Sequence, residues 1–335
     1  MTRFRPFRNT DPPALVDIWN RGMPRRNVVR PLKVHDWDAM VAGKPHFDHN
    51  GLIVAEQDGR VVAFAHAGFG PMEPHGPSHR LDTSMGSIAM FAAEPGVDDE
   101  AIDRGLIERA QDYLRGRGAA VLYAGGRNPI DPFYWGLYGG SEFSGVLGQH
   151  AAFHRAVRRT GFQPASTAVL LEFDMSKSEP RDPKLAMLRR QTRLEVMEDH
   201  PPLGWWAAIA IGPFRPTLFH LLSRSQSQVI ASALTWEFAS ELALGGLNRT
   251  ALIDVQVSPA FRRQGFGRLL VTEVLRHSRA TLAEVVDVQT LETNQAALAL
   301  YEGIGFQRVE TATLYRLPGD TSGAPRTASP SGLNS

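Results

Sequence analysis

The pattern of apolar and polar positions predicts the same succession of elements twice along the chain. In the first half, two apolar runs flank Asp58-Gly59, which is a strong signal for a hairpin turn. Apolar residues then recur at helical spacing from Ile102 to Leu114. The expected elements are a strand pair, a strand, a helix and a strand, at 51–56, 61–65, 87–92, 100–115 and 119–123. A further helix and Thr160-Gly161-Phe162 close this half.

The second half repeats this layout. A strand pair is expected at 218–222 and 229–238, followed by a strand at 250–257 and a helix at 267–279. A strand at 285–291 and a helix at 295–303 complete the unit, and Gly305-Phe306 ends it. Two β-rich units that share one order of elements predict an α/β (α+β) protein made of two tandem domains. Each domain is expected to be a mixed, mostly antiparallel sheet flanked by helices.

Composition between the two units suggests where they divide. Residues 177–183 are charged, include two prolines and follow an apolar run at 168–173. We therefore expect domains at 1–176 and 184–318, joined by this linker. Residues 319–335 are small and polar, without aromatics, and are expected to be disordered because they have little apolar surface to bury.

Charge and residue usage exclude several classes of function. The 335 residues include 36 basic and 35 acidic side chains, a balance that does not favour nucleic-acid binding. The chain has 0 cysteines, which excludes disulfides, thiolate metal sites and an acyl-cysteine intermediate. Its N-terminus lacks an apolar signal core, and the apolar run 205–211 is far shorter than the roughly 20 residues of a membrane helix. A soluble, cytoplasmic protein is expected.

A strand, a loop and a glycine-rich helix start carry the clearest chemical signal. The strand stops at Pro259, and the next helix opens near Gly265-Phe266-Gly267. Glycines let the backbone approach a ligand closely, and the free amides at a helix start carry positive partial charge. This combination is suited to a pyrophosphate, and Arg262, Arg263 and Arg268 add cations.

A second run makes the signal specific. Residues 291–306 read LETNQAALALYEGIGF. Together the two runs resemble the GNAT acetyltransferase family. The loop fits its Arg/Gln-x-x-Gly-x-Gly/Ala pattern, and the second run fits its Asn-x-x-Ala-x-x-Leu-Tyr-x-x-x-Gly-Phe pattern. The resemblance covers residues 184–317 and implies an N-acetyltransferase that uses acetyl-CoA or a related acyl-CoA, with no metal.

The resemblance also implies residue roles. Backbone groups of the strand before the loop would pair with the pantetheine arm, the loop would hold the pyrophosphate, Asn294 would contact the cofactor, and Tyr301 would protonate the leaving thiolate. The cofactor-binding residues expected on this basis are Val255, Gln256, Val257, Arg262, Arg263, Gln264, Gly265, Phe266, Gly267, Arg268, Asn294 and Tyr301.

The first half resembles the same family only in outline. Residues 93–100 stand in the place of the cofactor loop but carry acids and no Gly-x-Gly, and Val157 stands where Tyr301 stands. Acids repel a pyrophosphate, so we interpret this half as a degenerate GNAT domain that binds no cofactor. Tandem GNAT proteins with one active half, such as mycothiol synthase, are similar in layout.

The base and the acceptor are left open. Some protein N-acetyltransferases of the family have a glutamate five positions before the asparagine, where this chain has Gln289. Asp254, on the strand leading into the loop, is the preferred base, with ion pairing as the other interpretation of that residue. The strand alternates over 252–257, so that Leu252, Asp254 and Gln256 are expected on one face and the three residues between and after them on the other. A water relay, Glu237 and Glu292 are the remaining candidates. A small-molecule amine and a protein N-terminus are both compatible as acceptor, and a non-catalytic acyl-CoA-binding module is the alternative function.

Three weaker signals have ordinary structural interpretations. The histidines at 46, 49, 75 and 79 are expected on surface loops rather than around a metal. The aromatic and glycine-rich run 132–140 is either a loop that closes over the acceptor or a packed loop between the domains. Trp205 and Trp206 fall where GNAT proteins have acceptor-side helices, and core packing is expected for at least one of them.

Overall fold

The computed structural model describes residues 1–74, 76–127, 130, 133–140, 142, 145–178, 182–202, 204–211, 214–226, 228–237 and 248–319. The expected disordered tail lies outside the described residues except for Gly319, as does part of the expected linker, at 179–181. The ends of two other predicted segments, Phe238 and Pro132, and the predicted loop residue His75 also lie outside them.

The described elements of the first half follow the predicted order, with additions at both ends. They are β1 Thr2–Pro6, α1 Pro12–Gly22, α2 Val34–Trp37, β2 Leu52–Gln57, β3 Arg60–Pro71, β4 Leu81–Ala93, α3 Glu100–Gly116, β5 Val121–Ala124, β6 Val146–Leu147, α4 Ala151–Arg159 and β7 Gln163–Asp174. Short 3-10 and π turns lie at His49–Gly51 and Asp38–Ala42.

The second half repeats the order. Its elements are α5 Pro183–Gln191, β8 Thr192–Met197, α6 Gly204–Ile211, β9 Arg215–Ser223, β10 Val229–Glu237, β11 Arg249–Val257, α7 Phe266–Ala280, β12 Val285–Leu291, α8 Gln295–Ile304 and β13 Gln307–Arg316. A 3-10 turn at Pro259–Phe261 precedes α7. No described helix is both long and apolar enough to cross a membrane.

All described strands belong to one sheet, which confirms the expected mixed, mostly antiparallel architecture flanked by helices. The strand order is β1-β2-β3-β4-β5-β13-β7-β12-β11-β10-β9-β8, with β6 beside β13. In the described chain only the pairs β4–β5 and β11–β12 are parallel. The expectation of a separate sheet in each domain is therefore corrected: the two units share one sheet.

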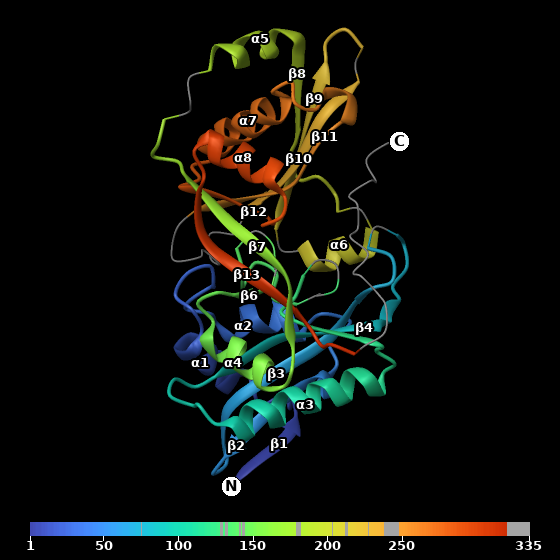
Figure 1. The fold of residues 1–335 in the computed structure, drawn as a ribbon, viewed down its shortest axis with the longest axis vertical. Helices are drawn as coiled ribbons and strands as arrows, with labels where there is room; N and C mark the ends of the chain where they lie inside the picture. Colours follow the sequence, from blue (N-terminus) through green and yellow to red (C-terminus); the bar gives the residue numbers. More distant parts are fainter. Residues whose placement is uncertain are drawn as a thin grey trace.

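Two exchanged strands make the sheet continuous. β7 belongs to the first half of the sequence, but it pairs along its length with β12 and β13 of the second half. β13 in turn pairs with β5 through Tyr315 and Arg316. The two long strands run side by side through the middle of the molecule (Figure 1). The boundary at 177–183 remains a prediction. Strands from both sides of it, β7 and β12, pair within the same sheet.

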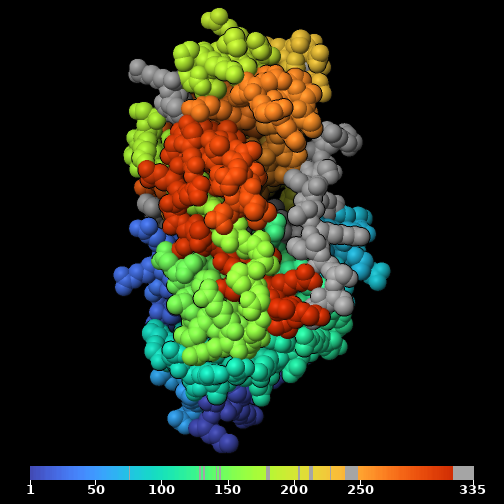
Figure 2. Space-filling model, viewed as in Figure 1, coloured from blue at the N-terminus to red at the C-terminus, as the bar shows by residue number. Residues whose placement is uncertain are grey.

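A shared apolar core joins the two halves. The loop residues Phe133 to Tyr138 are buried together with Phe214, Trp236 and Ile253 of the second half. The Trp135 and Trp236 rings stack with their centroids 6.0 Å apart. The described residues of the run 132–140 therefore form a packed loop between the domains, the second of the two interpretations. On the surface, the green end of the first half lies directly against the red α8 and β13 (Figure 2).

The short helix α6 rests on the first half. Trp206 is buried, and its ring centroid lies 4.9 Å from that of His46, while Trp205 lies 4.8 Å from His79. Lys44 is buried and donates a hydrogen bond to the Ile209 carbonyl, and burial lowers its pKa to about 8. His46 is half-buried rather than on the surface, and no cluster of potential metal ligands is found among the described residues.

Candidate functional site

The parallel strands β11 and β12 diverge at the site. Their pairing extends from Arg249–Leu252 to Val285–Val288, and the described residues show none between the strands beyond that point. β11 continues to Val257 while pairing only with β10 on its other side. The β12-facing edge of 253–257 therefore lies beyond the ladder with β12, and it is called the open edge of β11 below. The predicted residues Val255, Gln256 and Val257 all lie in this part of the strand.

A β-bulge at Asp254 changes the faces of this strand. The register passes from Ser232–Gln256 to Leu234–Ile253, which leaves one extra residue on β11. Asp254 has a φ of 50°, a left-handed conformation that aspartate tolerates better than most residues. The strict alternation predicted for 252–257 is therefore wrong: Ile253 packs in the core between the halves, but Val255 and Val257 pack on the opposite core, beneath α7 and α8.

The loop after β11 leads into a helix with an open start. Arg263 and Gly265 both have left-handed φ angles, 60° and 100°, and α7 begins directly afterwards at Phe266. The first-turn amides of a helix have no partner within it, and here no side chain caps them. The helix start that the motif predicts is thus present and uncapped, and the binding of an anion to it remains a prediction. Phe266 itself is buried and anchors the helix start in the core.

The two glycines of the motif have different surroundings. A Cβ on Gly265 would lie 3.2 Å from Leu188 Cδ1 and 3.5 Å from Lys184 Cε, on the side of α5. A Cβ on Gly267 would lie 3.3 Å from Val257 Cγ2 and 3.5 Å from Leu300 Cδ2, between the open strand and α8. Gly265 is therefore required for its backbone conformation, and Gly267 keeps space free between β11 and α8.

The polar side chains of the loop contact the protein itself. Arg262 Nε donates to the Val257 carbonyl at 3.0 Å, and Gln264 donates to the Ala260 carbonyl at 2.9 Å. Arg268 Nε lies 3.5 Å from Asp182 Oδ2, and Arg263 is exposed. The predicted cations flank the helix start in the sequence, and their contacts with an anion remain predictions.

The corresponding helix of the first half has a closed start. The N-cap of α3 is Asp99, whose carboxylate accepts a hydrogen bond from the Ala101 amide at 2.8 Å. The adjacent Asp98 is held by Arg155 and Arg159 at 3.2 and 3.0 Å. The protein's own carboxylates therefore occupy the place where an anion would bind. Val157, which replaces the tyrosine, is buried in the core.

Tyr301 and Asn294 both belong to α8. Tyr301 is buried, with a relative exposure of 5%, and the pKa of its hydroxyl is raised first by burial and then by the negative charge of Glu142. It therefore remains protonated at neutral pH. Asn294 is the N-cap of α8, and its side chain accepts a hydrogen bond from the Ala297 amide at 3.2 Å. Its expected contact with the cofactor remains a prediction.

A residue of the first half reaches this site, and the sequence did not indicate it. Glu142 is half-buried, and burial raises the pKa of its carboxyl to about 7. Repulsion by Asp254 adds to the rise, Arg127 opposes it, and Asp287 adds a smaller increase. No motif surrounds Glu142. The only available signal was the aromatic and glycine-rich run that ends two residues before it.

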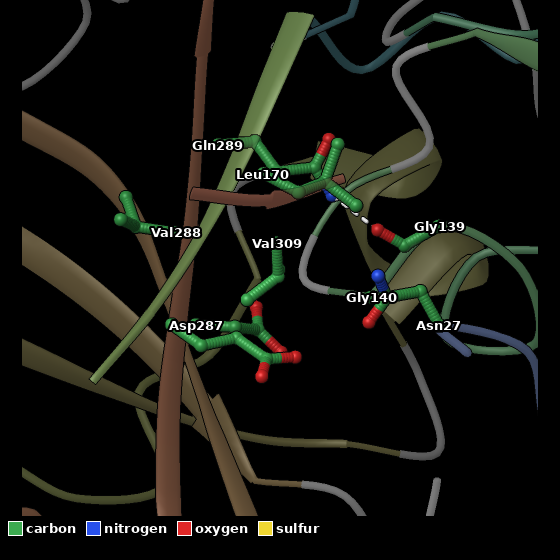
Figure 3. Close-up of a pocket in the computed structure, with 9 residues that line it drawn as sticks. Asn27, Gly139, Gly140, Leu170, Asp287, Val288, Gln289 and Val309 are labelled. Carbon is green, nitrogen blue, oxygen red and sulfur yellow. Dashed lines mark hydrogen bonds between the residues drawn. The ribbon is translucent and has the colours of Figure 1, made fainter. Parts of the chain in front are cut away.

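Gln289 holds the loop that carries Glu142. Its side-chain amide donates to the Gly139 carbonyl and, at 2.5 Å, to the Glu142 carbonyl. Figure 3 shows Gln289 reaching Gly139 beside a narrow crevice that Asp287 also lines. The buried Asp287 carboxylate lies 3.7 Å from Arg249 Nη1, which also contacts Glu172 at 2.7 Å. These contacts fix the first-half loop against β12.

The other candidate bases are placed differently. Asp254 Oδ1 accepts a hydrogen bond from Gln256 Nε2 at 2.7 Å, so the carboxylate lies at the open strand as predicted. Glu237 pairs with Thr250 near the start of β11, at the end opposite the open edge. Glu292 is exposed just beyond β12. Among the four carboxylates, Glu142 and Asp254 are the two that interact electrostatically at the site.

Part of the chain is similar in sequence to known proteins. Residues 186–306 match the model of the acetyltransferase (GNAT) family. A stretch of 55 residues is 44% identical to the N-alpha-acetyltransferase RimI of Mycobacterium tuberculosis, which covers 16% of this chain and 33% of that protein. The chain thus matches a third of the length of this curated relative.

Solved structures resemble the chain over most of its length. A tandem GNAT protein from the clavulanic acid biosynthesis pathway is similar over 94% of this chain and 98% of its own, with a TM-score of 0.62 and 14% identity. A fungal multi-domain GH3 beta-N-acetylglucosaminidase with a GCN5-related glucosamine N-acetyltransferase region is similar over 94% of this chain and 38% of its own, with a TM-score of 0.66 and 13% identity. At these identities the likeness concerns the fold alone.

Proposed function

We propose that the second half of the chain, which matches the acetyltransferase (GNAT) family over residues 186–306, transfers an acetyl or short acyl group from acyl-CoA to an amine. The observation that carries the proposal is the uncapped start of α7 beside the open edge of β11, with Tyr301 in the same unit. A strand edge and a helix start together suit an amide-bearing arm that ends in a pyrophosphate.

The residues present fit such a co-substrate. The open edge of β11 lies beyond the pairing with β12, and the missing side chain of Gly267 leaves room between Val257 and Leu300. The helix start and its surrounding arginines suit the pyrophosphate. The acyl-CoA supplies an activated thioester, so the protein's task is to position an amine, remove its proton and protonate the leaving thiolate.

Tyr301 is the proposed acid. Burial keeps its hydroxyl protonated, and the sequence motif aligns it with the family's tyrosine. The proton of the amine is taken by a carboxylate near the open edge of β11, where the predicted base Asp254 interacts electrostatically with Glu142. Direct attack of the amine on the thioester requires no covalent enzyme intermediate, which is consistent with the 0 cysteines of the chain.

The acceptor is proposed only as a class. The named relatives act on a glucosamine and on a protein N-terminus, so amino sugars and peptides with a free N-terminus are the first amines to test. The test incubates the protein with acetyl-CoA and a panel of such amines and measures thiol release. Release that depends on an added amine supports the transferase. Tight acetyl-CoA binding without release from any amine supports the non-catalytic module.

The same proposal predicts one cofactor site in each chain. Asp99 caps the start of α3 and Asp98 lies beside it, so of these two corresponding helices of the described chain only α7 has an uncapped start. Calorimetric titration with acetyl-CoA should therefore give a stoichiometry of about one. Two sites of similar affinity would contradict the assignment of the first half.

A further inference from the structure

We propose that Glu142, supplied by the first half, accepts the proton of the acceptor amine in the reaction of the second half. This inference rests on the proposed acyl transfer and adds a reason for the two units to be joined. The first half then completes the active site of the second and does more than support it.

The loop that carries Glu142 is placed by contacts with β12. Gln289 donates to the carbonyls of Gly139 and Glu142, with 2.5 Å to the latter. A Cβ on Gly140 would lie 3.5 Å from Asp287 Oδ2, so this loop packs closely on the strand between its two hydrogen bonds. Gln289 is the first residue of β12 beyond the pairing with β11. The backbone of Glu142 therefore lies at the point where the two strands diverge.

The charges around Glu142 come from four segments. Asp254 on β11 and Asp287 on β12 disfavour its ionised form, and Arg127, after β5, favours it. Tyr301 on α8 interacts with it as well, because the charge of Glu142 raises the pKa of the tyrosine. The proposed base, Glu142, and the proposed acid, Tyr301, thus interact electrostatically. A carboxyl with a pKa of about 7 is suited to accept and release a proton near neutral pH.

The proton balance of the reaction closes between these two residues. The neutral amine attacks the thioester carbon, the N–C bond forms and the C–S bond breaks. The nitrogen loses its proton to the Glu142 carboxylate, and the departing thiolate takes the proton of Tyr301. Transfer from Glu142 to the Tyr301 phenolate, directly or through water, then restores both groups, so that no further reactant is required.

This arrangement also explains a departure from the family pattern. A glutamate at position 289 would present carboxylate oxygens to the carbonyls of Gly139 and Glu142, and both would repel it. The amide of Gln289 donates to both carbonyls instead. The carboxylate missing from position 289 is therefore replaced by one on the loop that Gln289 holds. Asp254, whose oxygen accepts from Gln256 at 2.7 Å, acts on Glu142 through repulsion.

The test is the pH dependence of kcat/KM for Glu142→Gln, Asp254→Asn and the wild type with the same amine. Because the amine's own titration is common to all three, differences among them belong to the protein. Glu142→Gln should lower the rate by about 10²–10⁴-fold and remove an acidic limb near pH 7. Asp254→Asn should keep that limb but move it to lower pH, since one repelling charge is gone. Glu142→Asp should recover part of the rate.

Two controls separate catalysis from folding. Glu302→Gln removes an exposed carboxylate that pairs with Arg308 next to Tyr301 on α8, and it should behave as the wild type. Glu142→Gln should bind acetyl-CoA with unchanged affinity by calorimetry. A Glu142→Gln profile equal to that of Glu302→Gln would overturn the inference, and so would loss of the limb in Asp254→Asn alone. If the wild type releases no thiol with any amine, it is the proposed function that fails.

Discussion

Gly265 permits a sharp test of the proposed anion site. Its φ of 100° places it in the left-handed region, where an alanine costs about 1–2 kcal/mol. Gly267 lies two residues on, within α7, and has no left-handed φ. Alanine is favoured over glycine inside a helix by up to about 1 kcal/mol. We therefore compare Gly265→Ala with Gly267→Ala, two identical changes at neighbouring positions.

The expected effects have opposite signs. Gly265→Ala should lower the free energy of unfolding by about 1–2 kcal/mol through backbone strain, because the nearest atom to the new methyl group, Leu188 Cδ1 at 3.2 Å, belongs to a side chain that can move. Gly267→Ala should raise the free energy of unfolding by up to about 1 kcal/mol. The tight contact of its new methyl group with Val257, at 3.3 Å, reduces this gain. The two variants should thus differ by roughly 1–3 kcal/mol.

Binding should separate the variants further. If Gly265→Ala relaxes its φ, the first amides of α7 turn away from the loop, and the affinity for acetyl-CoA should fall by about tenfold or more, or roughly 1.4 kcal/mol. Gly267→Ala should retain most of the affinity, while Gly267→Leu should lose it by filling the space between Val257 and Leu300.

Urea unfolding and calorimetric titration measure both quantities. The two alanine variants are each other's control, since they remove the same flexibility from the unfolded chain. Equal stability and equal affinity of Gly265→Ala and Gly267→Ala would refute the assigned roles of the two glycines. Loss of stability in Gly265→Ala with wild-type affinity would refute the anion site alone.

Three further predictions follow from the same geometry. Tyr301→Phe should lower turnover by roughly 10–1000-fold with little change in acetyl-CoA affinity; a thiol-release rate equal to the wild type would exclude it as the acid. Burial raises the pKa of Glu142 from its ordinary 4.5 to about 7, so the folded state binds the extra proton and loses stability as pH rises through 7. Between pH 5.5 and 8.5, urea unfolding should show that the wild type loses about 1–2 kcal/mol of unfolding free energy to this group and that Glu142→Gln does not. The same change with pH in both proteins would contradict the raised pKa of Glu142. Trp135→Ala removes the ring that stacks on Trp236 and should lower the free energy of unfolding by about 3–5 kcal/mol. Calorimetry should show one thermal transition for both halves, at a lower temperature than in the wild type. Two separate transitions would show that the halves fold independently.

Much of the site was predictable because its parts are close in the sequence. The strand, the loop with Gly265 and Gly267, and the start of α7 are consecutive segments, and local conformational preferences and residue spacing specify them. Tyr301 and Asn294 follow after one helix and one strand. The open helix start therefore lies where the motif placed it. The closed start of α3 was likewise signalled by its run of acids.

The face of Asp254 could not be predicted in the same way. Alternation assumes a regular strand, but the register between β10 and β11 shifts at this residue, and a bulge reverses the faces of the positions that follow. Such a shift depends on which partner residues face each other across the pair. It leaves no mark in the strand's own apolar pattern, because every residue of 252–257 except Asp254 and Gln256 is apolar.

The sequence by itself determined the order of elements, the doubled layout and the acyl-CoA motif of the second half. The tertiary structure alone decided the exchange of β7 and β13, the packing of the aromatic loop on Trp236, and the arrival of Glu142 at β12. Each of these is a contact between segments more than 80 residues apart. The energy of such contacts comes from pairing and burial across the whole fold, and local periodicity carries no information about which distant partner a segment meets.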